Sequence, residues 1–311
     1  MIEQYYENVR YLQFNHFRQF PELIHGVFTR QGGYSSTPYA SLNTSAPPRG
    51  GGDNFEDVVR NRQLALQALH LSDTPNVTLW QIHSAQVLTL KPSDPWRTDW
   101  ASMTYYTKPW TPEFIHQGDG LVTQERGIAL ALSFADCVPI TFYDPVQQVA
   151  GIAHGGWRGT ARGIVLATIE EMQHHFGSRP QDIHAGIAPA IGPCCYEVSR
   201  EVEDLFLGRT SFDVQPTAER YRACINESAT FSTIQQPDGR ESLRLDLQIT
   251  NQKQLLMAGL APEHIEIIRI CTSCHTDLFF SHRKEEGRTG RFVVIMALTP
   301  SDAEEIDQTL A

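Results

Sequence analysis

The chain has 311 residues, of which 41% are hydrophobic and 20% charged, and its formal net charge is −11. This composition is ordinary for a soluble globular enzyme, and the length suffices for one large domain or two fused halves. The negative balance excludes broad binding to nucleic acid or anionic membranes, which requires a positive field, but local arginines would still suffice for a small anionic substrate.

Nothing near the start of the chain matches an export signal. The first residues are acidic and polar, and no stretch approaches the roughly 18 apolar residues of a membrane-spanning helix. Six cysteines are few for a secreted disulfide scaffold of this length. We therefore expect a cytoplasmic protein without a membrane partner, with cysteines reduced unless metal-bound. The sequence leaves the oligomeric state open.

The first third of the chain alternates extended segments with turns. Periodicity and breaker residues predict strands at 11–14, 24–30 and 77–83, loops at 31–35 and 45–53, and a helix at 54–71. The strand predicted at 77–83 places His83 at its end. Residues 91–118 have no period and several prolines, which predicts a surface insertion, either a binding lid or a decorative loop.

The remaining chain interleaves strands and helices. Apolar runs predict strands at 127–134, 138–143, 148–154, 183–187, 265–270 and 291–298, and helical spacing predicts helices at 160–176, 199–207 and 247–258. Gly177 is a suitable helix C-cap. The order predicts an α/β or α+β fold with mixed sheets.

Three short segments each place a metal-capable side chain beside small or turn residues. His83 lies in WQIHSA, Cys137 in SFADCVP and His154 in AHGGWRGT. One thiolate and two imidazoles form a ligand set with an open coordination position, as in catalytic zinc sites. Their separations match no zinc-finger spacing, so the spacing alone is weak support.

The neighbouring residues strengthen this hypothesis. Asp136 is an ionisable group where a strand should be apolar, and its burial requires a partner. Glycines beside His154 permit close backbone approach, and Arg158 offers a guanidinium fork to an anion.

Several segments together resemble a known family. They are residues 41–43, 81–84, 119–123, 135–140, 153–160, 192–198 and 287–291. In this order they are similar to the laccase-domain family of the bacterial YfiH type, formerly called multicopper polyphenol oxidases and now described as purine nucleoside phosphorylases.

The resemblance implies one domain over 1–311 with layered mixed β-sheets flanked by helices. It also implies a Zn²⁺ ion held by His83, Cys137 and His154, and cleavage of adenosine or inosine by phosphate to ribose 1-phosphate and free base. Methylthioadenosine cleavage and adenosine deaminase activity are ascribed to relatives. Two departures stand out: the 91–118 segment is long, and Lys284 replaces an arginine, which removes a bidentate fork.

Phosphorolysis requires cations that hold phosphate. Arg158, Arg60 and Arg283 are the candidates, and only Arg158 has support from a motif. Asp136 is the candidate carboxylate assisting a zinc-activated water in deamination, or alternatively a residue that orients a metal ligand. Asn43 is a candidate substrate contact.

Two other functions stay open. A copper-dependent polyphenol oxidase would use the same His₂Cys set, although the His-x-His pairs of a trinuclear site are missing. A peptidoglycan-precursor editing hydrolase would use Cys137 as nucleophile and His154 as base. Nucleoside and phosphate remain the expected partners, with zinc, or alternatively copper, as the cofactor.

Two cysteine patterns remain outside these hypotheses. Residues 271–275 fit the C-x-x-C-H haem-attachment pattern, which requires export. Cys194 and Cys195 are adjacent, and adjacent cysteines rarely form a relaxed disulfide. Neither pattern therefore predicts a function here.

Overall fold

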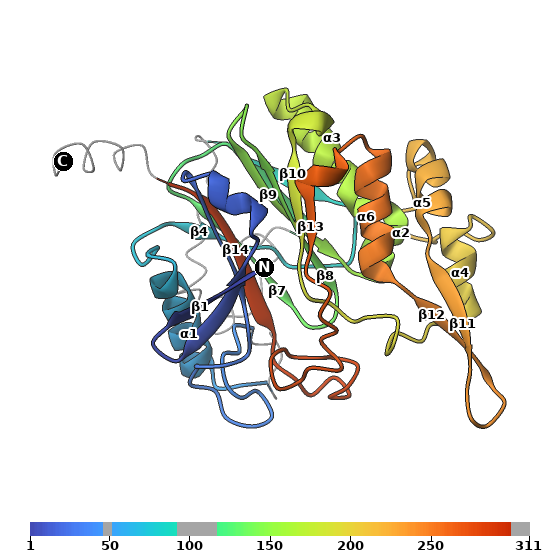
Figure 1. Ribbon diagram of the computed structural model, residues 1–311, viewed down its shortest axis with the longest axis horizontal. Coiled ribbons are helices and arrows are strands. Elements are labelled where there is room, and N and C mark those ends of the chain that lie inside the picture. The colour runs from blue at the N-terminus through green and yellow to red at the C-terminus, as the bar shows by residue number, and fades with distance from the viewer. Residues whose placement is uncertain (46–51, 92–116, 300–311) are drawn as a thin grey trace.

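Two mixed β-sheets form the centre of the computed structural model, which describes residues 1–45, 52–91 and 117–299 (Figure 1). The first sheet has the order β1 (Ile2–Tyr6), β2 (Val9–Gln13), β3 (Leu23–Phe28), β14 (Phe292–Leu298), β7 (Ala129–Phe134) and β4 (Asn76–Val77). The second has the order β13 (Ile265–Ile267), β10 (His184–Ile187), β8 (Val138–Asp144), β9 (Val149–Gly155), β6 (Gly120–Thr123) and β5 (Val87–Leu90). Neighbours are antiparallel except β7–β4, β13–β10 and β6–β5.

The two sheets pack face to face because their strands are apolar on both sides. Leu130, Leu132 and Phe134 of β7 enter the core between the sheets, where they join Ile152 of β9. The intervening residues of β7, such as Ala131, point to the opposite face. A strand between two apolar layers needs no polar face, which explains the continuous apolar runs in the sequence.

Helices cover both outer faces, so the layers run helix, sheet, sheet, helix. The first sheet is covered by α1 (Phe55–Ala68). The second is covered by α2 (Trp157–Arg162), α3 (Ile164–Phe176) and α6 (Leu247–Met257). Beyond α6 lie α4 (Arg200–Phe206), α5 (Arg222–Ser228) and the hairpin of β11 (Phe231–Gln235) and β12 (Glu241–Leu245), on the right of Figure 1. Short 3-10 helices occupy His16–Gln19, Pro180–Asp182, Glu219–Tyr221 and Pro262–His264.

The predicted fold class, layered mixed sheets with flanking helices, is confirmed. The helix predicted at 54–71 begins after Asn54, whose side chain accepts a hydrogen bond from the Glu56 N–H at 2.8 Å. Three consecutive strands from β7 to β9 match their predicted ranges within two residues. Gly177 ends α3 with φ 72°, as predicted.

Two predicted elements are wrong. The strand at 77–83 ends at Val77, and His83 instead lies in a turn with φ 58°. The helix at 160–176 begins at Trp157 and is broken at Gly163, whose φ is +85°. A Cβ atom at that position would lie 2.7 Å from the Tyr221 ring, so close packing favours the glycine and the break.

Other elements carry too little periodicity to be predicted. They are β1, β5, β6, α5 and the β11–β12 hairpin. The strand predicted at 265–270 is also shorter, ending at Ile267. The predicted insertion at 91–118 falls mostly within 92–116, and part of the 45–53 loop within 46–51, both outside the described residues.

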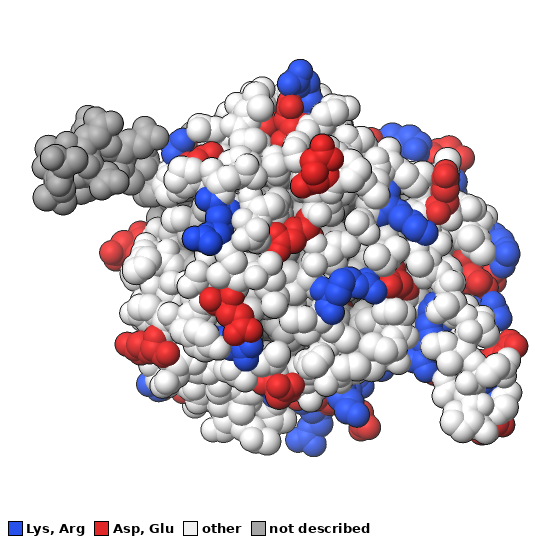
Figure 2. All heavy atoms as spheres, in the orientation of Figure 1, with Lys and Arg blue, Asp and Glu red and all other residues white. Residues whose placement is uncertain are grey.

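Surface charge is mixed. Lys and Arg are interspersed with Asp and Glu over the face shown in Figure 2. Of the helices in the described ranges, none is long and apolar enough to cross a bilayer.

Buried histidines make the fold acid-sensitive. Burial lowers the pKa of His25 to about 3, and its Nε2 accepts a hydrogen bond from the Phe14 N–H at 2.9 Å. Burial also lowers the pKa of His184 to about 4. Both rings stay neutral when folded, whereas the unfolded chain takes up their protons below about pH 6.5.

Stability from His25 and His184 is therefore fully present above about pH 6.5 and declines as pH falls toward their folded pKa values. We expect each ring to contribute up to about 1.4 kcal/mol per pH unit to this decline. Urea unfolding at several pH values should show a flatter slope for His25→Gln than for the native chain. The exposed variant His174→Gln serves as control, and equal slopes for all three proteins would contradict the prediction.

Candidate active site

A cavity of about 550 Å³ is lined by turns from both sheets. Its walls combine metal-capable, cationic and aromatic side chains. They are Ser45, Leu79, Trp80, Gln81, His83, Ser133, Ala135, Asp136, Cys137, His154, Trp157, Arg158, Tyr196, His282, Arg283 and Arg291. The volume lies within the range of about 300–1,000 Å³ that is typical of small-molecule sites.

The three predicted ligands meet in this cavity. One nitrogen each of His83 and His154 and the Cys137 sulfur all lie within 4.8 Å of one another. His154 belongs to β9, Cys137 directly precedes β8, and His83 comes from the turn after Gln81. The fold thus joins residues from three separate segments.

Backbone geometry aims these side chains. Asp136 has φ 86° and His83 has φ 58°, left-handed conformations that are uncommon for residues other than glycine. Such conformations persist where the surrounding structure imposes them, and they concentrate at functional sites. The turn at Asp136 connects β7 with β8 and directs Cys137 into the cavity.

Gly156 leaves room for the ligands. A Cβ atom there would lie 3.0 Å from the Cys137 sulfur and 3.0 Å from Cδ2 of His83. Its φ of −68° is accessible to any residue, so only side-chain crowding requires glycine at this position.

We expect Gly156→Ala to fold normally but to bind metal about tenfold more weakly, because its methyl group displaces two ligands. Chelator competition measures the affinity and thermal unfolding the stability. Gly26→Ala, on β3 and outside the cavity, is the control for glycine replacement, because an added Cβ there would meet side-chain carbons of Leu69 and Phe28 at a similar 3.1–3.2 Å. Unchanged metal affinity in Gly156→Ala would contradict this reading of the close contacts.

Asp119 organises the ligands from behind. Its fully buried carboxylate contacts His154 Nδ1 at 2.8 Å and accepts hydrogen bonds from the N–H groups of His83 at 3.0 Å and Ser84 at 2.6 Å. The Ser84 hydroxyl donates a further bond at 2.7 Å. Burial opposes ionisation, but the bonds from His154 and Ser84 outweigh it and lower the Asp119 pKa. A carboxylate on Nδ1 leaves Nε2 of His154 for a metal.

Cys137 and His154 are strongly coupled. Burial disfavours the thiolate, but the adjacent His154 and His83 rings outweigh it and lower the Cys137 pKa to about 6. Burial likewise opposes charge on His154, yet Cys137 and Asp119 raise its pKa to about 10. A thiolate is the form of cysteine that binds metals and acts as a nucleophile.

The donor set fits a metal ion. A thiolate sulfur and two imidazole nitrogens are ligands that Zn²⁺ prefers, and three protein ligands leave a fourth position open. The Asp119–His154 contact matches the carboxylate–histidine arrangement that supports metal ligands. His83, Cys137 and His154 would therefore be the ligands.

Asp136 is held in the cavity wall. Its Oδ1 accepts a hydrogen bond from the Thr272 hydroxyl at 2.7 Å, and its Oδ2 accepts one from the backbone N–H of Arg283 at 2.6 Å. Only 7% of the residue is exposed. These bonds connect the turn before Cys137 to the segment that carries Arg283.

The four predicted substrate contacts fall into two groups. Arg158 and Arg283 line the cavity. Arg60 instead lies on the exposed side of α1, with its guanidinium over the Tyr34 ring at 3.6 Å. Asn43 is fully buried behind the cavity wall, and its Oδ1 accepts a hydrogen bond from the backbone N–H of Arg291 at 2.8 Å.

Sequence reasoning missed several residues of the site. Asp119 lies in the family-like segment 119–123, but the sequence analysis gives it no role. Its signal is the one that indicates Asp136: an acidic residue directly before an apolar strand. Tyr196, His282 and Arg291 line the cavity from segments distant in the chain. Only tertiary packing identifies these three.

Comparisons with known proteins identify the family of this chain. Residues 24–299 match the family described as multi-copper polyphenol oxidoreductase laccase. Purine nucleoside phosphorylase YlmD of Geobacillus stearothermophilus is 36% identical over 277 residues, 89% of this chain and 90% of that protein. A purine nucleoside phosphorylase of Bacteroides thetaiotaomicron is 31% identical over 284 residues, 91% and 94% of the two chains.

Solved structures show the same fold. The crystal structure of YlmD from Geobacillus stearothermophilus has a TM-score of 0.76 and 34% identity, covering 96% of this chain and 98% of that one. The structure of YfiH from Bacillus licheniformis has a TM-score of 0.74 and 33% identity, covering 94% and 97%. The layered sheets therefore recur in both proteins.

Proposed function

This chain belongs to the multi-copper polyphenol oxidoreductase laccase family, and from that membership we propose that its 311 residues form one zinc-dependent purine nucleoside phosphorylase domain. Relatives covering most of the chain carry the name purine nucleoside phosphorylase. The substrates would be inosine or adenosine and phosphate, and the products ribose 1-phosphate and free base. Methylthioadenosine cleavage and adenosine deamination belong to the same proposal.

One observation carries this proposal: a single cavity combines the His83, Cys137 and His154 ligand set with Arg158 and Arg283. The arginines supply the positive charge and N–H donors that phosphate requires, despite the net negative charge of the chain. Trp157 and Tyr196 supply aromatic surface for a base or sugar.

Arginine geometry favours a phosphate beside Tyr196. The Arg283 guanidinium donates to the Glu197 carbonyl at 2.9 Å and lies 5.1 Å from the Tyr196 ring centre, which holds it in the wall. Arg158 is braced over the Trp157 ring at 4.3 Å. Positioned guanidinium groups orient an anion because little side-chain freedom remains to be lost.

In the proposed reaction a phosphate oxygen forms a bond to C1′ of the ribose while the bond from C1′ to the base nitrogen breaks. The bonding electrons leave with the base, which then accepts a proton. Burial raises the pKa of Tyr196, which stays neutral in this wall. A Zn²⁺ ion at the three ligands would supply Lewis-acid charge to an oxygen in the cavity.

A metal-free hydrolase is the second candidate, favoured by one contact. Asp119, His154 and Cys137 are arranged like the orienting acid, base and nucleophile of a cysteine hydrolase. The third donor, His83, favours a metal instead, since a hydrolase of this kind has no need for it. A copper oxidase would use the same three ligands.

Metal analysis and a nucleoside assay separate these functions. Protein purified without added metal is expected to contain zinc rather than copper and to release hypoxanthine from inosine only when phosphate is present. Incubation with adenosine tests deamination through inosine formation. Hypoxanthine release without phosphate would contradict phosphorolysis, and phenol oxidation by copper-loaded protein would favour the oxidase.

Arg158→Gln tests the phosphate site. Losing one charged hydrogen-bonding partner is worth about 1.5–3 kcal/mol, so we expect the KM for phosphate to rise about 10- to 100-fold. The matched control is Arg209→Gln, which removes an exposed arginine paired with Asp204. An unchanged phosphate KM in Arg158→Gln would exclude Arg158 as a phosphate contact.

A further inference from the structure

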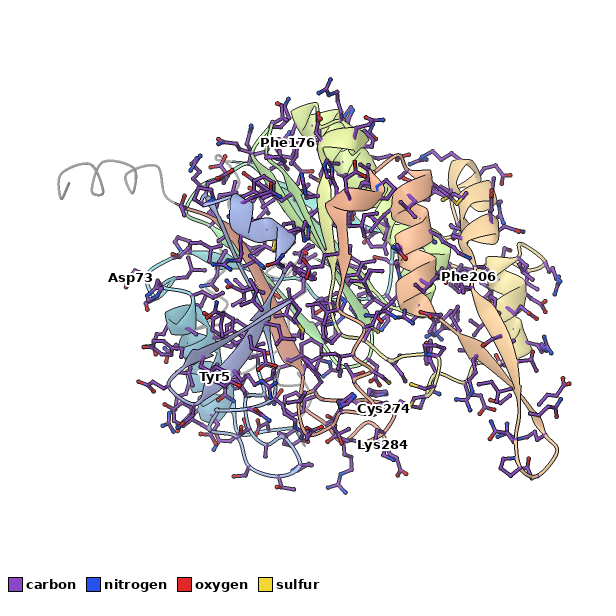
Figure 3. The ribbon with its side chains drawn as sticks, in the orientation of Figure 1. Tyr5, Asp73, Phe176, Phe206, Cys274 and Lys284 are labelled. Atoms are coloured by element: carbon purple, nitrogen blue, oxygen red, sulfur yellow. The ribbon has the colours of Figure 1, made fainter. Side chains whose placement is uncertain are left out.

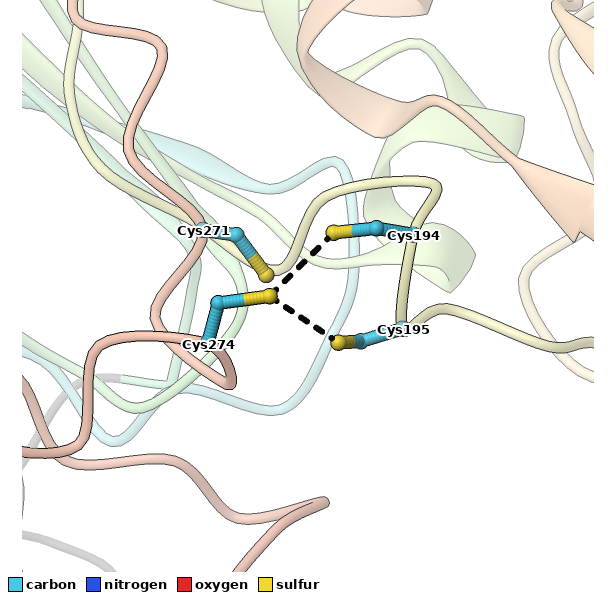
Figure 4. A group of neighbouring side chains, drawn as sticks. All are labelled: Cys194, Cys195, Cys271 and Cys274. Atoms are coloured by element: carbon cyan, nitrogen blue, oxygen red, sulfur yellow. Dashed lines mark hydrogen bonds between the residues drawn. The ribbon is translucent and has the colours of Figure 1, made fainter.

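We propose that Cys194, Cys195, Cys271 and Cys274 bind a second zinc ion, which holds one wall of the cavity in place (Figure 4). This site is separate from the His83, Cys137 and His154 set, and only its expected effect on nucleoside KM rests on the proposed function. It brings together the two cysteine patterns that the sequence left without a function.

The four sulfurs converge from two loops. All four lie within 4.8 Å of one another, and the Cys274 sulfur is 3.5 Å from that of Cys194 and 3.4 Å from that of Cys195. Figure 4 shows the four side chains pointing toward a common centre. Tetrahedral zinc with Zn–S bonds of about 2.3 Å places its sulfurs about 3.8 Å apart, close to these separations.

The fold positions both loops at one edge. β10 and β13 are parallel neighbours, so the loops that follow them leave the sheet in the same direction. Further contacts join these loops, because the Thr272 N–H donates to the Ala190 carbonyl at 3.1 Å. A backbone hydrogen bond therefore connects the two loops that carry the cysteines. Cys274 lies near the molecular surface (Figure 3).

Backbone contacts and access from solvent suit a metal at this cluster. The Gly192 N–H donates a hydrogen bond to the Cys271 sulfur at 3.2 Å, which helps to hold this side chain in place. Four thiolates with one Zn²⁺ carry a net negative charge, and Arg244 donates to the Cys194 carbonyl at 3.5 Å. All four thiols are free, and two are exposed, so a metal can reach them.

Other uses of these cysteines fit less well. A haem bound through Cys271 and Cys274 would need both thiols to face a porphyrin, whereas they face Cys194 and Cys195. A single disulfide would use only two of the four sulfurs, so it would not explain why the other two thiols also point toward the same centre. A closed four-sulfur set matches structural zinc, which takes all its ligands from the protein.

The cluster lies beside the cavity wall in both loops. Cys195 directly precedes Tyr196, which lines the cavity. Cys271 directly precedes Thr272, whose hydroxyl holds Asp136. Zinc across the two loops would therefore restrain Tyr196 and Asp136 together, a positioning role that affects substrate binding more than the chemical step.

Metal counting tests this site directly. We expect about two zinc ions per purified chain, and about one in Cys195→Ser and in Cys274→Ser. Cys224→Ser, which removes a free cysteine on α5, is the matched control and should retain both. The two cluster variants should also raise the nucleoside KM by a larger factor than they lower kcat.

Cobalt spectroscopy keeps the test independent of enzymatic activity. Cobalt(II) added to metal-free Cys137→Ala protein, whose catalytic ligand set is broken, should give the visible and thiolate charge-transfer bands of tetrahedral cobalt–sulfur coordination. The bands should disappear in Cys137→Ala combined with Cys274→Ser.

Two results would overturn the proposal. One is a single zinc ion per native chain that Cys137→Ala removes and the cluster variants retain. The other is a native chain that, unfolded without reductant, shows two fewer free thiols than its reduced form. Both are read without the nucleoside assay, so failure here is distinguishable from failure of the proposed function.

Discussion

Replacing Cys137 with alanine is expected to abolish nucleoside cleavage while leaving the fold intact. The change removes the only sulfur from the His83, Cys137 and His154 set and leaves the sheets untouched. Substituting a residue that merely supports a metal ligand typically lowers metal affinity or activity about 10–100-fold. Loss of a ligand itself should therefore lower kcat/KM by more than about 100-fold. Hypoxanthine release from inosine measures the effect.

The same loss is expected for His83→Ala and His154→Ala. Cys224→Ala is the control, since it removes a cysteine outside both thiol-containing groups. Circular dichroism and thermal unfolding should show that all variants fold. Unchanged hypoxanthine release by Cys137→Ala would disprove the assignment of this cavity as the active site.

Asp119→Asn is expected to be the most damaging substitution among residues that do not themselves bind metal. The two carboxylate oxygens accept hydrogen bonds from the backbone N–H groups of His83 and Ser84 and contact Nδ1 of His154. An asparagine amide replaces one of these oxygens with an NH₂ group, which donates hydrogen bonds instead of accepting them. The NH₂ group then faces another N–H donor at a position that is fully buried. We expect metal affinity to fall about 10–100-fold and unfolding free energy by about 1–3 kcal/mol.

Chelator competition and urea unfolding measure these two effects of Asp119→Asn. Asp204→Asn is the control, because its exposed pair with Arg209 should contribute about 1 kcal/mol or less. Metal affinity equal to that of the native chain would mean that the Asp119 contact does not set the orientation of His154.

The ligand set bears on the copper named in the family description. Electron-transfer copper sites with two histidines and one cysteine add a weak axial ligand, usually methionine. Among the described residues, none of those lining the cavity is methionine. Three donors with an open position therefore support the proposed zinc ion over copper.

Local patterns predicted much of the fold. The continuous apolar run of β7 follows from one apolar layer on each side of the strand, and the helix predicted at 54–71 begins after Asn54 as α1. Prediction failed where distant contacts decide local structure. Gly163 breaks a helix because Tyr221 packs against it, and the apolar run after Val77 leaves the sheet so that Asp119 can bind the turn at His83.

The sequence by itself singled out side chains that meet in the cavity: His83, Cys137 and His154, each beside glycine or turn residues, and Arg158 as their cationic neighbour. Local composition suffices for that, because a ligand or cation is recognised by its own side chain and its flexible neighbours.

Only the tertiary structure decided which of these residues meet. It placed Asp119 behind His154, Arg60 outside the cavity and Asn43 behind Arg291. It also joined Cys194 and Cys195 to Cys271 and Cys274. The physical reason is that these contacts depend on strand order and register, which arise from burying three apolar cores at once and leave no periodic trace in any one segment.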